Sequence, residues 1–261
     1  MNNQYGIIPV WQELEHETHP ALEETEIHLW CLPLKLTSIQ QEMALTLLSD
    51  IQKDRYSRRK TTELKQSYLA GRYYLLNLLS HYTNTPAKEI VLSYSRLNKP
   101  SLLDKKSNIE FNFTDTRLPN TQDSTKNSSY GLFAFCKKYS IGVDVESLDR
   151  KANFAAISAD RFSKEEQQYV TDESGDVSPE RCLAIWTRKE AFGKAIGKGI
   201  NFKMNALNLN SPKNFKLNFT SHNDDWRLIQ LQLSDSLISC VAHQSHQNLD
   251  VKAFNSAGHI N

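Results

Sequence analysis

The most regular feature of the sequence is the recurrence of apolar residues at helical spacing over residues 61–82, which predicts one helix with charged first turns and buried last turns. The same spacing predicts helices over 38–50, 163–170 and 180–196. In the helix over 38–50 the core candidates are Met43, Leu45, Leu47 and Leu48.

Short apolar or alternating runs between these helices predict strands. They lie at 27–32, 90–94, 109–113, 130–136, 141–146, 207–209, 215–219, 228–233, 237–242 and 251–254. Helices enclosed by strands occur twice, so we predict an α+β fold of two similar halves. A polar stretch at 116–129 is predicted to be an exposed loop. We divide the chain into lobes at 1–138 and 139–245, followed by a final strand and loose tail at 246–261.

The composition is that of a folded protein, with 39% hydrophobic and 23% charged residues. The net charge of +1 gives no overall field that would attract nucleic acid or an anionic membrane, so we expect neither partner. The neutral total hides a basic segment at residues 51–72. A small polyanion could therefore be bound locally.

The four cysteines are widely spaced and form no CxxC pair, which disfavours a zinc site. The first residues do not resemble a signal peptide, and no apolar run approaches the ~18 residues of a membrane span. We therefore expect reduced thiols and a cytoplasmic location.

Two acidic residues lie on one face of the predicted strand at 141–146. Because side chains alternate along a strand, Asp144 and Glu146 point one way and Val143 and Val145 the other. Two neighbouring carboxylates repel each other, and a hard cation such as Mg²⁺ would offset that repulsion. The alternative is an edge strand with a solvated acidic face.

The helix at 180–196 carries Trp186, Glu190 and Lys194 at i, i+4 and i+8, so the three share one ridge. The simplest interpretation is an exposed ion pair worth about 0.3 kcal/mol beside a core tryptophan. The largely apolar circumference of the helix argues against a freely solvated acid. Gly197 and Gly199 are expected to end the helix.

Together, GVDVE at 142–146 and WTRKEAFGK at 186–194 resemble the signature of the Sfp-type 4'-phosphopantetheinyl transferases. In that family a G-(I/V)-D-(I/V/L)-E strand precedes a W-x-x-K-E-(A/S)-x-x-K helix. Weaker similarity extends to Lys99-Pro100, Phe111-Asn112 and the FSKEE run at 162–166, so the resemblance covers about residues 50–210.

The resemblance implies a two-lobed α+β pseudodimer with its active site between the lobes. It implies transfer of the phosphopantetheine arm of coenzyme A to a serine of a carrier protein, with release of 3',5'-ADP. The implied Mg²⁺ ligands are Asp144, Glu146 and Glu190. Catalysis would rest on Glu190, as one candidate proton acceptor beside a metal-bound water, and on Lys194 at the phosphates. The implied coenzyme A contacts are Arg55, Lys99, Lys189, Lys194, Thr114 and Asp115.

One position departs from the family pattern. Where the family commonly has F-N-x-S-H-S, this chain has Asp115 in place of the histidine, and an ionised carboxylate cannot donate a hydrogen bond to phosphate. Either Asp115 turns away and Thr114 or Thr116 takes over as donor, or Asp115 contacts the adenosine or a metal-bound water.

The expected partner is an acyl or peptidyl carrier domain of a fatty acid, polyunsaturated fatty acid, polyketide or non-ribosomal peptide synthase. Chain length favours a monomer. Two alternatives stay open at this stage. One is a metal-dependent phosphodiesterase or nucleotidyl transferase that uses the same carboxylates. The other is a carrier-binding protein without catalytic activity.

Overall fold

The computed structural model describes residues 2–3, 6–13, 20–118, 128–199, 202–210, 226–245 and 247–255. The first half holds β1 (Asn2–Asn3), β2 (Gly6–Ile7), β3 (Trp11–Glu13), β4 (Glu26–Pro33), α1 (Ser38–Leu47), α2 (Asp50–Ser57), α3 (Thr62–Thr83), η1 (Ala87–Glu89), β5 (Leu92–Tyr94), β6 (Pro100–Leu102), β7 (Ile109–Leu118) and β8 (Ser128–Lys137). The second half holds β9 (Ile141–Ser147), α4 (Phe154–Arg161), α5 (Lys164–Val170), α6 (Pro179–Ala195), η3 (Met204–Ala206), β10 (Trp226–Ser234), β11 (Leu237–Gln244) and β12 (Asp250–Asn255).

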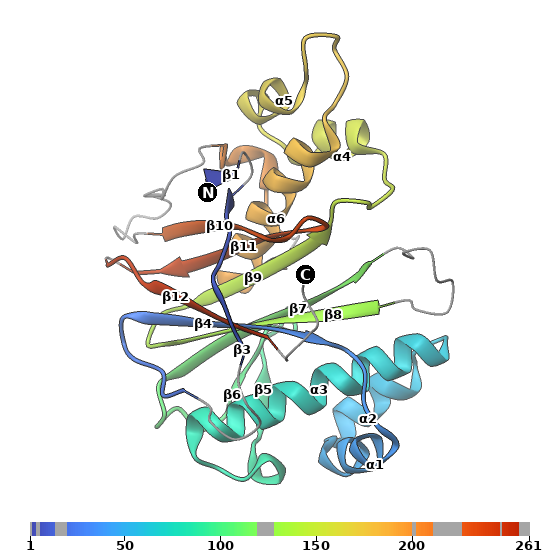
Figure 1. The fold of residues 1–261 in the computed structure, drawn as a ribbon, viewed down its shortest axis with the longest axis vertical. Coiled ribbons are helices and arrows are strands. Elements are labelled where there is room, and N and C mark those ends of the chain that lie inside the picture. The colour runs from blue at the N-terminus through green and yellow to red at the C-terminus, as the bar shows by residue number, and fades with distance from the viewer. Residues whose placement is uncertain are drawn as a thin grey trace.

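The two halves repeat one topological plan (Figure 1). Apart from the terminal strands β1, β2, β3 and β12 and the β5–β6 hairpin, each half has one strand, then three α-helices, then two strands, the last of which inserts between the other two. The resulting orders are β4-β8-β7 in the first half and β9-β11-β10 in the second. The fold is therefore α+β, as predicted, with two lobes built alike.

Each lobe takes terminal strands from the other end of the chain. The first sheet has the order β3-β12-β4-β8-β7, and β12 pairs in parallel with β4 over the whole of 250–255. The second sheet has the order β1-β2-β10-β11-β9, in which β2 comes from the N-terminal segment. The expected boundary at 138/139 falls in the turn between β8 and β9, but neither lobe is one continuous stretch of sequence.

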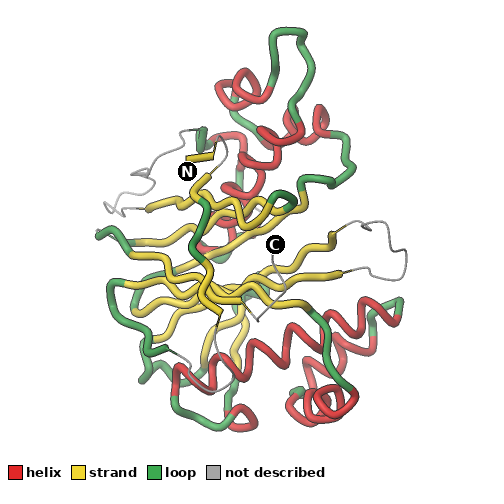
Figure 2. The backbone as a smooth tube through the Cα atoms, in the orientation of Figure 1, coloured by secondary structure: helices red, strands yellow, loops and turns green. Residues whose placement is uncertain are grey.

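Helices lie outside the strands, as Figure 2 shows, and hydrophobic cores fill the space between these layers. One core lies between the two sheets and joins Leu29, Leu132, Val143 and Val241. A second packs α1 and α3 against the outer face of the first sheet. A third packs α6 against the second sheet through residues such as Phe192 and Cys240. The order is thus helix, sheet, sheet, helix, and the active-site residues can be sought where the two sheets meet.

Most predicted elements are confirmed, within one to a few residues at their ends. The strand expected at 207–209 is wrong, because these residues follow η3 without joining a sheet. Met43 and Leu45 are also wrong as core residues: their exposed fractions are 52% and 42%, while Ala44 and Leu48 are buried. The strand expected at 215–219, the centre of the polar loop at 119–127, and the tail at 256–261 lie outside the described residues.

The cysteines behave as the sequence indicates. All four are free and buried, and burial raises the pKa of each thiol to about 12. Among the described residues, no helix is both long and apolar enough to cross a membrane.

Candidate active site

Along one border of the core between the sheets, the edge strands β7 and β9 lie against each other, and this seam carries the polar residues of interest. The buried Asn112 on β7 bridges the two strands, since its Oδ1 accepts a hydrogen bond of 3.0 Å from the Val143 backbone N–H on β9. A buried amide that satisfies a backbone donor fixes the register of one strand against the other. The relative position of β7 and β9 is therefore fixed, so side chains from both lobes can form one site at this seam.

Helix α6 lies directly on β9 at Gly142. A Cβ atom at this glycine would come within 2.1 Å of the Ala191 carbonyl oxygen and 2.3 Å of the Ala195 backbone nitrogen. Only a glycine allows helix backbone to approach strand backbone so closely. This contact brings the ridge of α6, with Trp186, Glu190 and Lys194, against the polar face of β9.

Asp144 is the centre of the polar cluster. Its Oδ1 accepts a 2.7 Å hydrogen bond from Lys194 Nζ and a 3.3 Å hydrogen bond from Thr114 Oγ1. Lys194 also donates to Thr114 Oγ1 at 2.9 Å and to the Val143 carbonyl at 3.1 Å. Burial raises the pKa of Asp144, and the charge of Lys194 opposes that rise. Lys194 thus lies against the acidic strand β9, while its contact with a coenzyme A phosphate stays a prediction.

Two further carboxylates adjoin Asp144. Burial, followed by repulsion from Asp144, raises the pKa values of Glu146 and Glu190 to about 7 each. Glu146 Oε1 accepts a 3.0 Å hydrogen bond from Trp186 Nε1 and is also ion-paired with Arg150. Glu190 comes from α6 and Glu146 from β9, so acids from two elements each interact with Asp144.

The donor set partly fits a divalent cation. Asp144 Oδ2 and Glu190 Oε1 are buried without a hydrogen-bond partner among the described residues, so each has an oxygen available for a ligand. Glu146, in contrast, has Oε1 committed to Trp186 and Arg150. Within the described part of the chain, no three acidic, histidine or cysteine side chains are assembled as a metal-binding group. Asp144 and Glu190 thus suit an oxygen-preferring ion such as Mg²⁺, and Glu146 would join only by releasing Arg150 or using its second oxygen.

A cavity of about 250 Å³ opens beside Lys194. Its lining includes Arg55 of α2, Arg72 of α3, Lys99 of the β5–β6 hairpin and Asn112 of the seam. Arg55 Nη2 donates to Asn98 Oδ1 at 2.8 Å, and its guanidinium lies 4.3 Å from the centroid of the Tyr94 ring. The cavity therefore gathers the guanidinium groups of Arg55 and Arg72 near Lys194, an arrangement suited to a phosphorylated ligand.

The residue that sequence reasoning missed is Arg72. It is 7% exposed, lines the cavity, and has an Nε atom without a hydrogen-bond partner among the described residues. Burial lowers the pKa of its guanidinium, which lies 4.3 Å from the Phe113 ring centroid. A signal was available, because Arg72 falls on the apolar stripe of α3 that contains Leu69, Leu76 and Leu79. A charged residue at a core position needs a partner or a ligand.

Lys189, expected beside the phosphates, lies elsewhere. Its side chain is 0% exposed, and its Nζ contacts Glu166 Oε2 at 2.8 Å and the carbonyls of Met204 and Leu207 at 2.7 Å each. Glu166 also accepts from the Leu209 N–H at 2.6 Å. With all three ammonium donors in use, Lys189 anchors the segment after α6 to α5 and has no donor left for a ligand.

The remaining predicted residues, Thr114 and Asp115, lie apart from each other. Thr114 is buried in the Asp144 cluster. The exposed Asp115 points to the other face of β7, where it lines a smaller cavity of about 110 Å³ together with Arg59, Arg72 and Arg117. Arg72 borders both cavities, whereas Asp115 lines only the smaller one.

The site combines acidic side chains that can hold a metal, a lysine in contact with one of these acids, and cations in an adjoining cavity. These features define the class of sites that bind phosphorylated substrates.

Residues 140–247 match the model of the 4'-phosphopantetheinyl transferase superfamily, and this segment contains Asp144, Glu146, Glu190 and Lys194. The chain is also similar to two cyanobacterial proteins. It is 26% identical over 226 residues to the 4'-phosphopantetheinyl transferase HetI of Nostoc sp., covering 85% of this chain and 89% of HetI. It is 27% identical over 179 residues to the putative 4'-phosphopantetheinyl transferase slr0495 of Synechocystis sp., covering 69% and 68% of the two chains.

Proposed function

We propose that the chain is an Mg²⁺-dependent 4'-phosphopantetheinyl transferase of the Sfp type, which moves the phosphopantetheine arm of coenzyme A to a serine of a carrier protein. The family match and the two relatives support the transferase activity. One observation carries the proposal. At the seam of the lobes, Asp144 and Glu190 each have a buried oxygen with no hydrogen-bond partner among the described residues, and the cation-lined cavity opens beside the neighbouring Lys194.

In this reaction a serine oxygen forms a bond to the β-phosphorus of coenzyme A, and the bond from that phosphorus to the bridging oxygen breaks to release 3',5'-ADP. Arg72 and Arg55 bind the anionic groups of coenzyme A in the cavity. Lys194 stabilises the charge that develops on the 5'-phosphate of the leaving 3',5'-ADP. Glu190, which adjoins Asp144 and Lys194, takes the serine proton.

Asp144 and Glu190 would hold the metal, with Glu146 adjoining them. A bound Mg²⁺ would offset the negative charge of the pyrophosphate. The partner we propose is an acyl or peptidyl carrier domain of a fatty acid, polyunsaturated fatty acid, polyketide or non-ribosomal peptide synthase. The protein would act as a cytoplasmic monomer.

The test is incubation with coenzyme A, Mg²⁺ and an apo carrier protein, followed by intact mass spectrometry of the carrier. We expect the carrier to gain one phosphopantetheine mass with the wild type. Asp144→Ala should lose this gain while keeping its fold. The matched control is Asp149→Ala, which removes an exposed acid just beyond β9 and should leave the gain intact. Breakdown of coenzyme A without a modified carrier would instead support a phosphodiesterase, and binding without any product a non-catalytic carrier-binding protein.

A further inference from the structure

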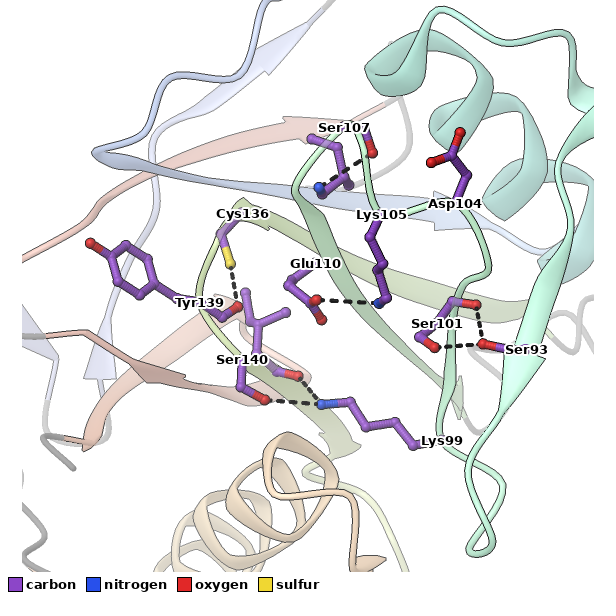
Figure 3. Close-up of polar contacts among 12 residues, drawn as sticks. Ser93, Lys99, Ser101, Asp104, Lys105, Ser107, Glu110, Cys136, Tyr139 and Ser140 are labelled. Atoms are coloured by element: carbon purple, nitrogen blue, oxygen red, sulfur yellow. Dashed lines mark hydrogen bonds and ion pairs between the residues drawn. The ribbon is translucent and has the colours of Figure 1, made fainter. Parts of the chain in front are cut away.

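The side chain of Lys99 reaches from one lobe to the other. Lys99 stands at the end of the turn that joins β5 to β6, and this turn is closed by the Ser95 N–H donating to the Lys99 carbonyl at 3.0 Å. From this hairpin the ammonium extends to the second lobe, as Figure 3 shows for Lys99 and Ser140. Nζ donates to Ser140 Oγ at 3.3 Å, to the Ile141 carbonyl at 3.3 Å and to the Ala195 carbonyl at 2.7 Å.

These acceptors use the whole donor capacity of the ammonium, which has three N–H groups. Lys99 is therefore unlike Arg72, which borders the same cavity with an unpaired Nε. Burial lowers the pKa of Lys99, opposed by the charge of Glu110. The aliphatic stem of Lys99 lines the cavity, but its charged end lies on protein backbone.

The backbone acceptors lie at the C-terminal end of α6 and at the start of β9. Ala195 is the last residue of α6, where helix carbonyls lack partners and carry the negative end of the helix dipole. The neighbouring end groups of α6 are satisfied locally, with Gly197 N–H donating to Lys194 and Lys198 N–H to Gly193. The Ala195 carbonyl instead receives Lys99 and Ser140 Oγ, the latter at 2.7 Å. Ile141 is the first residue of β9.

We infer that Lys99 is a positioning residue that joins the first lobe to the end of α6 and the start of β9, and so sets Lys194 and Glu190 against Asp144. Helix and strand are already in backbone contact at Gly142, one residue from Ile141. A cation that binds both elements beside this contact keeps the last turn of α6 on β9. Loss of Lys99 would leave the Ala195 carbonyl one donor short and release the turn that carries Lys194.

Amide hydrogen exchange at the end of α6 tests the inference without an activity assay. Lys99→Met keeps the stem and removes the donors, so we expect the amides of residues 196–198 to exchange at least 10-fold faster. Lys99→Arg, which keeps donors, should retain most of the protection. The control is Lys105→Met, which removes an exposed lysine paired with Glu110 at 3.5 Å and should leave exchange unchanged. Unchanged exchange in Lys99→Met would overturn the inference.

A second measurement separates positioning from ligand binding, and this part rests on the proposed function. We expect Lys99→Met to keep its affinity for 3',5'-ADP within 3-fold by calorimetry and to lower kcat for carrier modification at least 10-fold with little change in KM for coenzyme A. A 10-fold loss of affinity with normal kcat would instead make Lys99 a phosphate ligand. If the wild type modifies no carrier, the proposed function fails while the exchange result still decides the role of Lys99. If Lys99→Met does not fold, Ser140→Ala removes the second donor to Ala195 and should raise exchange in the same segment.

Discussion

At the scale of single residues, the site combines buried polar groups that would lower the stability of the fold if no ligand were ever bound. Within the described ranges of the chain, Asp144 and Glu190 each bury an oxygen without a hydrogen-bond partner, and Arg72 buries such an Nε. Leaving a buried polar atom unsatisfied costs about 1–3 kcal/mol. Three such atoms around one seam indicate a site selected for binding at the expense of stability.

Glu190→Gln should therefore separate function from stability. We expect carrier modification to fall at least 100-fold, because the variant loses both a metal ligand and the proposed base. In metal-free solution at pH 8 the free energy of unfolding should rise by about 1–2 kcal/mol, because the buried charge of Glu190 and its repulsion from Asp144 are gone. Chemical denaturation measures this difference. Glu173→Gln, in an exposed loop, should change neither quantity, and a destabilised Glu190→Gln would contradict the assignment.

Arg72→Met should weaken binding of 3',5'-ADP by about 10- to 100-fold, since charge-assisted hydrogen bonds contribute about 1.5–3 kcal/mol. The fold should tolerate the change because methionine fills much of the same apolar stripe of α3. Isothermal titration calorimetry gives the affinity. Arg58→Met is the control, since Arg58 is an exposed residue paired with Asp54 on α2 and should bind normally. Equal affinities in both variants would exclude Arg72 from the anion site.

The sequence allowed the acidic cluster to be predicted but not its surroundings. Strand alternation places Asp144 and Glu146 together, and helical spacing places Trp186, Glu190 and Lys194 on one ridge. Spacing cannot reveal that Lys189, next to Glu190, turns into the core, because its partner Glu166 is on another helix. Burial, which distinguishes Lys189 from Lys194, is a property of the tertiary fold.

At the scale of elements, the contact of α6 with β9 decides whether the ridge meets the acids. Gly142→Ala should cost about 3 kcal/mol or more, since the added methyl group meets backbone atoms that cannot rotate away. Gly71→Ala is the matched control within α3, where the nearest atom to the new methyl group would be 3.9 Å away. It should stabilise the protein by about 0.5–1 kcal/mol through helix propensity. Urea denaturation of both variants tests the contrast, and a tolerated Gly142→Ala would show that the helix can move.

Strand β11 carries a buried histidine that should make stability depend on pH. Burial, helped by Arg227, lowers the pKa of His243 to about 4 from an ordinary value near 6.5. The folded state therefore favours neutral His243, and its contribution is fully present above pH 6.5 and is lost as pH falls toward 4. The full difference corresponds to about 3 kcal/mol.

Denaturation midpoints between pH 8 and pH 4 measure this effect. His243→Gln should lose less stability over that range than the wild type, because glutamine does not take up a proton. Parallel pH profiles for the two proteins would mean that His243 does not titrate between the folded and unfolded states.

Helices and strands with a clear period were predictable, whereas short or mixed ones were not. Helix α3 matches its pattern closely because a long apolar stripe defines it. The apolar pattern predicts the position of helix α1 correctly but not which of its residues are buried. Only Ala44 is buried in this helix, and several of its large apolar residues are exposed. The short β1, β2, β3 and β6 have too few residues to show alternation.

At the scale of the whole molecule, the exchange of terminal strands ties the lobes together. Phe254 on β12 is 1% exposed and packs against Trp30 and His28 of β4, with ring centroids 4.7 and 5.0 Å apart. Phe254→Ala should cost about 3–5 kcal/mol and unfold both lobes in one transition. Val10→Ala is the control, because Val10 is 85% exposed and its truncation should change stability by no more than about 0.5 kcal/mol. Two separate transitions in calorimetry would contradict this coupling.

The duplicated plan could be predicted from the alternation of helices and strands, but the exchange could not. Pairing between Asp250 and Glu26, or between Leu231 and Ile7, joins residues more than 200 positions apart. Such pairs leave no local pattern, because each strand alone is compatible with several neighbours in a sheet.

The position of β12 has a consequence for synthesis on the ribosome. Residues 26–137 emerge early and contain nearly every element of the first lobe, yet their sheet stays incomplete beside β4 until residues 250–255 have been translated. During that interval β4 presents a free edge able to pair with other nascent chains. Chaperone dependence should therefore be greatest while the second half of the message is being read, and should end when the last strand closes the gap.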